Sequence, residues 1–90
     1  SVHLENYQGK LIDGATKKPI ANAPVTLGNV VVRTDAKGMF HLTGDGAYVK
    51  FRAPGYERGR YPASEITRQH AISLRPFKVK ALYLTVYGLS

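Results

Sequence analysis

Residues 34–40 read TDAKGMF, a stretch in which the residue types of a tight turn lead directly into an aromatic side chain. The carboxylate of Asp35 can accept hydrogen bonds from backbone N–H groups two or three positions further on, and such bonds close a local turn. Gly38 suits a backbone position with positive φ, which a side chain would resist. The stretch therefore predicts a type I turn followed by a glycine bulge.

Apolar side chains alternate with others on both sides of this turn. Val30 and Val32 share one face before it, and Phe40 and Leu42 share one face after it. A period of two residues is typical of β-strands that bury one side. We therefore predict that residues 30–42 form a β-hairpin centred on the turn.

Four further segments alternate in the same way, with turn residues between them. Residues 62–70 alternate poorly, and we expect a loop there with one helical turn after Ser64. Because the segments are short and no long helix is indicated, the sequence predicts an all-β, antiparallel β-sandwich. The residues of these four segments expected to face the core are Tyr7, Leu11, Ala23, Val25, Leu27, Val49, Phe51, Ala53, Ile72 and Leu74.

Length and composition fit one small globular domain. The chain has 90 residues, of which 43% are hydrophobic and 21% are charged. No run approaches the ~20 apolar residues that a membrane span requires. The absence of cysteine excludes disulfides, thiol catalysis and cysteine metal sites. Since the chain begins at Ser1 without a signal-like apolar segment, we expect a mature product or an excised piece of a longer protein.

Positive charge is concentrated in the second half of the chain. Residues 1–45 contain five Lys or Arg and four Asp or Glu, which gives +1, whereas residues 46–90 contain eight and two, which gives +6. A basic half suits an acidic partner, such as a polyanionic glycan, a nucleic acid, an anionic lipid or an acidic protein face. A merely solvated basic surface is the alternative.

Aromatic and cationic residues gather around the segment YVKFRAPGY, residues 48–56. If APGY turns the chain back, the residues after it lie near the outward side chains of the strand before it. Aromatics among cations bind single-stranded nucleic acid or an anionic sugar through stacking and charge. Because no motif of the nucleic-acid-binding folds is present, an anionic polysaccharide is the better candidate. The predicted binding residues are Tyr48, Lys50, Arg52, Arg58, Arg60 and Tyr61.

Four motifs follow one another in a specific order: GKLID (9–13), TKKPIANAPVTL (16–27), TDAKGMF (34–40) and VKFRAPGY (49–56). This order resembles the carboxypeptidase regulatory-like domain, a transthyretin-like β-sandwich. The resemblance implies a prealbumin-like, Greek-key type sandwich of about seven strands over residues 1–77, acting as a non-catalytic module. The residues at matching positions are Gly9, Asp13, Pro19, Ile20, Ala23, Val25, Thr34, Asp35, Gly38, Phe40, Gly55 and Tyr56.

Nothing in the sequence indicates a metal, a cofactor or a catalytic centre. The three histidines, His3, His41 and His70, lack ligand spacing and an accompanying carboxylate cluster. The final residues YGLS are faintly similar to the terminus of the transthyretin-like hydroxyisourate hydrolases, which use histidine and arginine. Gly88 and Leu89 stand where that motif has arginine, so an enzyme of this kind is the least favoured reading.

The tail KALYLTVYGLS, residues 80–90, is apolar on both faces of a strand, as in a parallel sheet covered on both sides. It resembles the first barrel strand of a glycoside-hydrolase-like domain, so we expect residues 78–90 to form a linker and the start of a following domain. A final sandwich strand is the alternative.

These features together predict an accessory module of a bacterial secreted, periplasmic or cell-envelope protein. Its partner would be an adjacent, polysaccharide-acting domain of the same polypeptide, or an anionic polysaccharide bound directly.

Overall fold

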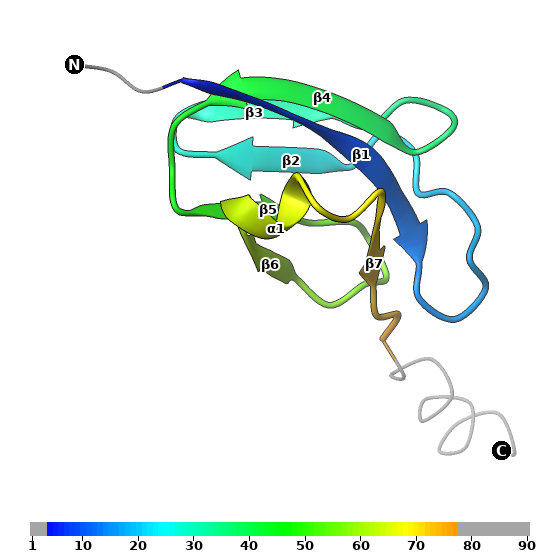
Figure 1. The fold of residues 1–90 in the computed structure, drawn as a ribbon. Helices are drawn as coiled ribbons and strands as arrows, with labels where there is room; N and C mark the ends of the chain where they lie inside the picture. Colours follow the sequence, from blue (N-terminus) through cyan, green and yellow to red (C-terminus); the bar gives the residue numbers. More distant parts are fainter. Residues whose placement is uncertain (1–3, 78–90) are drawn as a thin grey trace, which may run out of the picture.

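The structure, a computed structural model, describes residues 4–77, which form two β-sheets packed face to face (Figure 1). The strands are β1 (Glu5–Asp13), β2 (Pro24–Leu27), β3 (Val30–Arg33), β4 (Met39–Gly44), β5 (Tyr48–Phe51), β6 (Gly59–Pro62) and β7 (Ala71–Leu74). One sheet has the order β4-β1-β7 and the other the order β3-β2-β5-β6. The predicted all-β sandwich is confirmed.

One apolar core lies between the sheets, because each strand turns alternate side chains inward. Phe40 from one sheet meets Phe51 from the other, with ring centroids 5.3 Å apart and an edge-to-face angle of 69°. Such aromatic pairs add roughly 0.5–1.5 kcal/mol beyond the area they bury. Of the residues predicted to face the core, only Ala53, Val30 and Val32 are half-buried rather than fully buried.

The turn at residues 34–40 has the predicted chemistry. The carboxylate of Asp35 accepts hydrogen bonds from the backbone N–H groups of Lys37 and Met39, both at 2.9 Å. Gly38 has a φ of 77°, and its N–H donates to the carbonyl of Asp35. The turn closes on itself through these bonds.

The predicted hairpin, by contrast, is wrong. β3 pairs with β2 and β4 pairs with β1, so residues 34–38 carry the chain from one sheet to the other. The buried Thr34 anchors this crossing, since its hydroxyl donates to the carbonyl of Ile20 and accepts from the N–H of Ala23. Period-two alternation reports which side of a strand is buried, but not which strand lies beside it.

Two further features were not predicted. β1 and β7 run parallel, with Leu11 opposite Ile72, whereas all other strand pairs of the described chain are antiparallel. β6 is an edge strand that contains a glycine and a proline, and such a segment lacks the alternation of apolar residues that marks a strand.

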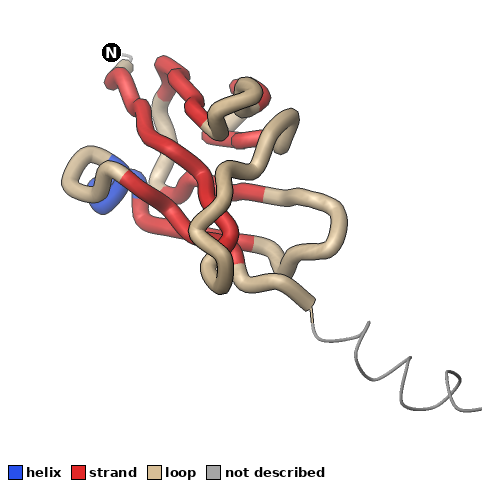
Figure 2. Tube along the Cα trace, turned by 90° about the vertical axis from the view of Figure 1, so that its right-hand side faces the viewer, coloured by secondary structure: helices blue, strands red, loops and turns tan. Residues whose placement is uncertain are grey.

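The predicted helical turn is present as α1 (Ala63–Ile66), which begins before Ser64 rather than after it. Ala63 and Ile66 are buried, and α1 packs against β1, β5 and β6. It covers one open side of the sandwich, as the view turned by 90° shows (Figure 2). No helix of the described chain is long and apolar enough to cross a membrane.

Two sequence predictions fall on parts of the chain outside the described residues. These are the linker and following-domain strand at 78–90 and the expectation that His3 is not a metal ligand. The domain boundary at residue 77 therefore stays a prediction. Within the described residues, the last strand of the sandwich ends at Leu74.

Candidate basic surface

The antiparallel pairing of β5 and β6 brings several of the predicted binding residues together. Lys50 lies directly opposite Arg60, and Tyr48 lies opposite Pro62. Alternation places Tyr48, Lys50 and Arg60 on the outer side of the four-stranded sheet, where all three are exposed. Arg52, which directly follows β5, is exposed as well.

Tyr48 and Arg60 are in contact across the two strands. The guanidinium carbon of Arg60 lies 4.0 Å from the centroid of the Tyr48 ring. A cation–π contact at an exposed site is worth about 0.5–1 kcal/mol. The contact restrains the Arg60 side chain over the sheet and occupies one face of the Tyr48 ring.

A fourth cation, Arg33, belongs to the same surface and was missed in the sequence. β2 lies between β3 and β5, with Pro24 opposite Arg33 and the carbonyl of Pro24 accepting the N–H of Arg52 at 3.3 Å. We call this surface, made of Arg33, Lys50, Arg52 and Arg60, the basic face. The signal available for Arg33 was its outward position after Val32, but its nearness to β5 depends on sheet order.

The basic face contains no compensating acid. The four strands of its sheet have no Asp or Glu in their sequences. Lys50 and Arg60 are therefore like charges placed directly opposite one another, an arrangement that destabilises a sheet. The cations raise the local potential and attract anions to this side of the molecule.

The outer face of the three-stranded sheet has a different character. Its pairs include Asn6 opposite Thr43 and Gln8 opposite His41, and the hydroxyl of Thr43 donates to the side chain of Asn6. Lys10 is its one Lys or Arg among the strand residues. The strands of the two sheets thus differ in charge, with more cations on the outer face of the four-stranded sheet than on that of the three-stranded sheet.

Tyr61 does not lie on the basic face, contrary to its predicted place there. Neighbouring residues of a strand point to opposite sides, so Tyr61 turns inward while Arg60 turns outward. Its ring packs edge-on against Phe51 with centroids 5.9 Å apart, and its hydroxyl donates a 2.6 Å hydrogen bond to the carbonyl of Ser73. Tyr61 thereby links β6 to β7 at the open side of the sandwich.

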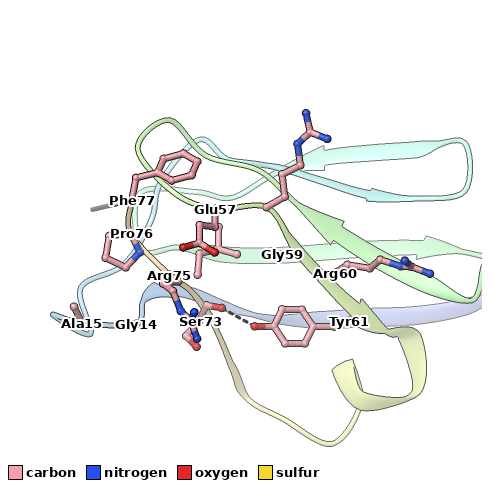
Figure 3. A pocket seen from close by; sticks show the side chains of 12 residues that line it. Gly14, Ala15, Glu57, Gly59, Arg60, Tyr61, Ser73, Arg75, Pro76 and Phe77 are labelled. Atoms are coloured by element: carbon pink, nitrogen blue, oxygen red, sulfur yellow. Dashed lines mark hydrogen bonds between the residues drawn. The ribbon is translucent and has the colours of Figure 1, made fainter. Parts of the chain in front are cut away.

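A groove of about 1000 Å³ runs between β6 and β7, and we call it the edge groove (Figure 3). Its lining carries both charges, with Glu57 beside Arg58 and Arg75. The backbone N–H of Glu57 donates to the carbonyl of Arg75 at 2.8 Å, which ties the two walls together. Arg60 extends away from Glu57 and Arg75 in this view, toward the basic face.

The described histidines do not form a metal centre. His41 is on the outer face of the three-stranded sheet, and His70 directly precedes β7. Among residues 4–77, no three His, Cys, Asp or Glu side chains are grouped so that they could hold a metal ion.

The fold and this surface together define a small all-β sandwich with one basic, acid-free sheet face. In comparisons with known proteins, no family model, no curated protein and no solved structure matches the chain. The resemblance to the carboxypeptidase regulatory-like domain rests on the motif residues and stays a prediction.

Proposed function

We propose that this chain is a non-catalytic accessory module that contacts an anionic polysaccharide through its basic face. The observation that carries the proposal is the pair Lys50 and Arg60, held opposite one another in a sheet without acidic residues. A pair of this kind costs folding free energy in the unbound protein, and a bound polyanion offsets that cost. The order of the motifs that resemble a regulatory-like domain supports the accessory role.

An anionic sugar polymer fits this face better than single-stranded nucleic acid does. Proteins that bind single strands stack successive bases on aromatic side chains. One face of the Tyr48 ring is occupied by Arg60, and Tyr61 is turned toward the core. The face therefore offers mainly charge and hydrogen-bond donors, which suit carboxylate groups along a polymer.

Titration of the protein at low salt with polygalacturonate, neutral dextran and single-stranded DNA tests the proposal. We expect binding to polygalacturonate, none to dextran, and a steep loss of affinity as salt is raised. The double variant Lys50→Glu/Arg60→Glu should abolish binding while the protein stays folded, as a cooperative thermal unfolding transition would verify.

A matched control keeps the same change in net charge but leaves the basic face intact. Lys18 and Arg68 are exposed and lie outside the four-stranded sheet, so Lys18→Glu/Arg68→Glu should retain most of the affinity. Equal losses in both double variants, or no binding of polygalacturonate at low salt, would contradict the proposal. Tighter binding to DNA than to polygalacturonate would contradict the ligand class.

Contact with an adjacent domain of the same polypeptide is the second candidate function. It is favoured by Phe77, which is 51% exposed at the edge groove and directly precedes residues 78–90. Aromatic residues and arginine are enriched at protein–protein contacts, and the edge groove contains Arg58 and Arg75 beside Phe77. In the longer polypeptide, Phe77→Asp should increase the separation of the domains measured by small-angle scattering, and an unchanged profile would argue against this role.

A further inference from the structure

A second cavity, of about 620 Å³, lies at one end of the four-stranded sheet. Three arginines line it: Arg33 at the end of β3, Arg52 directly after β5, and Arg58 directly before β6. None of the residues that line it is acidic. We call this cavity the arginine pocket. Its volume falls within the range of roughly 300–1,000 Å³ that is typical of small-molecule sites.

Hydrogen bonds hold the arginines on two sides of a proline. Arg33 lies opposite Pro24, the backbone N–H of Arg52 donates to the Pro24 carbonyl, and all three residues line the pocket. One terminal nitrogen of Arg33 donates to the carbonyl of Asn22 at 3.0 Å. A guanidinium has five N–H donors in a fixed plane, so this bond orients Arg33 while other donors remain for a ligand.

The rest of the lining is mainly apolar, with Asn22 as its one polar amide side chain. Pro54, Tyr56 and Phe77 contribute rings to the lining. Tyr56 is held in position at both ends, since its hydroxyl donates to the Asp13 carboxylate at 2.7 Å and its backbone N–H donates to the carbonyl of Ala53 at 3.1 Å. The pocket thus combines three arginines with a wall of rings, one of which is held at its hydroxyl by Asp13.

From this combination we infer that the arginine pocket binds one acidic sugar unit of the anionic polymer. The arginines bind the carboxylate, and guanidinium groups do so through paired N–H donors. The carbon side of the sugar ring packs against the apolar wall. The inference rests on the proposed function, because Arg33 and Arg52 belong to both the basic face and the pocket, so a polymer along the face leads into the pocket.

Binding of sodium D-galacturonate, a single acidic sugar, tests the pocket separately from the face. In proton–nitrogen correlation spectra at low salt, we expect galacturonate to shift the side-chain signals of Arg33, Arg52 and Arg58, and D-galactose to leave them unchanged. Inorganic sulfate provides the charge without the ring, so it should bind more weakly than galacturonate. Equal binding of sulfate and galacturonate would overturn the assignment to a sugar.

Two double variants each remove two positive charges. One removes them from the arginine pocket, and the other removes them from the part of the basic face outside the pocket. Arg33→Gln/Arg58→Gln should weaken galacturonate binding by about tenfold or more, the loss expected when charged hydrogen bonds are removed. Lys50→Gln/Arg60→Gln, measured at about 0.15 M salt where charges outside a site are screened, should leave it within about twofold, because neither side chain lines the pocket. All four side chains are exposed, and a cooperative unfolding transition verifies that both variants fold.

The results of these titrations distinguish a failure of the pocket inference from a failure of the basic-face proposal. If polygalacturonate binds but galacturonate shifts none of the three arginines, the pocket inference is overturned and the basic-face proposal stands. Equal weakening of galacturonate binding in both double variants overturns it too. If galacturonate binds at the arginines while polygalacturonate does not bind, the basic-face proposal fails and the pocket is supported.

Discussion

The hydroxyl of Tyr56 donates a 2.7 Å hydrogen bond to the carboxylate of Asp13, a residue 43 positions earlier in the chain. Asp13 ends β1, and its carboxylate also accepts the backbone N–H groups of Ala15 and Thr16 at 2.7 and 2.9 Å. The carboxylate thereby joins the turn after β1 to the loop between β5 and β6. Asp13 ends the motif GKLID and Tyr56 ends the motif VKFRAPGY, so this hydrogen bond connects two of the motifs in the folded chain.

The bond between Asp13 and Tyr56 predicts a pH dependence of stability. The Tyr56 hydroxyl, followed by the N–H of Thr16, lowers the pKa of the Asp13 carboxyl below its usual value. A carboxyl with a lowered folded-state pKa stabilises the fold above its unfolded-state pKa, and this stabilisation is lost as pH falls through the folded-state pKa. Chemical unfolding between pH 7 and pH 2 should show this loss.

Tyr56→Phe removes the largest cause of that pKa shift and keeps the ring. We expect the midpoint of thermal unfolding at pH 7 to fall by about 5 °C, as the loss of one such hydrogen bond does in a domain of this size. The difference between wild type and variant should shrink as the pH falls through the lowered folded-state pKa of Asp13. A difference that stays constant across this range would show that Asp13 is not the partner that matters.

Gly38 and Gly55 allow a test of backbone strain against steric overlap. Both have positive φ, 77° and 85°. An added Cβ at Gly38 would lie 2.6 Å from the carbonyl oxygen of Leu11, whereas at Gly55 it would have no neighbour within 4 Å. Gly55→Ala should therefore cost about 1–2 kcal/mol from φ alone.

Gly38→Ala should cost more, roughly 2–4 kcal/mol, because the backbone of β1 must also shift. Gly38→Val should be at least as damaging, since a β-branched residue tolerates positive φ poorly. Denaturant melts of the alanine variants provide the comparison. Equal free energies of unfolding for both would show that the Gly38 turn does not press against β1.

Asp35 should stabilise the crossing between the sheets through its two backbone hydrogen bonds. Asp35→Ala removes both and should lower the free energy of unfolding by about 1 kcal/mol. Asp35→Asn retains a side-chain oxygen that can accept the N–H groups of Lys37 and Met39, so it should retain most of the stability. A loss in Asp35→Asn as large as that in Asp35→Ala would argue against this role of the side-chain oxygen.

Tyr61→Phe should loosen the edge of the three-stranded sheet. The variant keeps the ring against Phe51 but loses the hydrogen bond to the carbonyl of Ser73. We expect faster hydrogen exchange at Ile72 and Leu74 in β7, with unchanged exchange at Val25 in the other sheet, because edge strands open locally. Uniform acceleration in both sheets would indicate global destabilisation instead.

Local chemistry accounts for the parts of the fold that could be predicted. The alternation of apolar residues identified the inward side chains of Phe40, Leu42, Val49 and Phe51, which are all buried. β6 was not predicted because Gly59 and Pro62 interrupt the alternation of apolar residues that marks a strand, so that Tyr61 is its one large inward side chain. In the candidate site, Tyr48, Lys50, Arg52 and Arg60 were predicted to be exposed and close together, and all four are exposed. The alternation that places Val49 and Phe51 in the core also turns Tyr48, Lys50 and Arg52 outward.

The sequence by itself determined the strand faces, the turn at Asp35 and Gly38, and the excess of positive charge, because each depends on residues close together in the chain. Only the tertiary structure decided that β3 and β4 lie in different sheets, that Arg33 joins Lys50 and Arg60, and that Tyr61 turns away from them. Strand neighbours are selected by how all inward side chains pack into one shared core. That selection depends on contacts between distant residues, which no local pattern in this sequence reports.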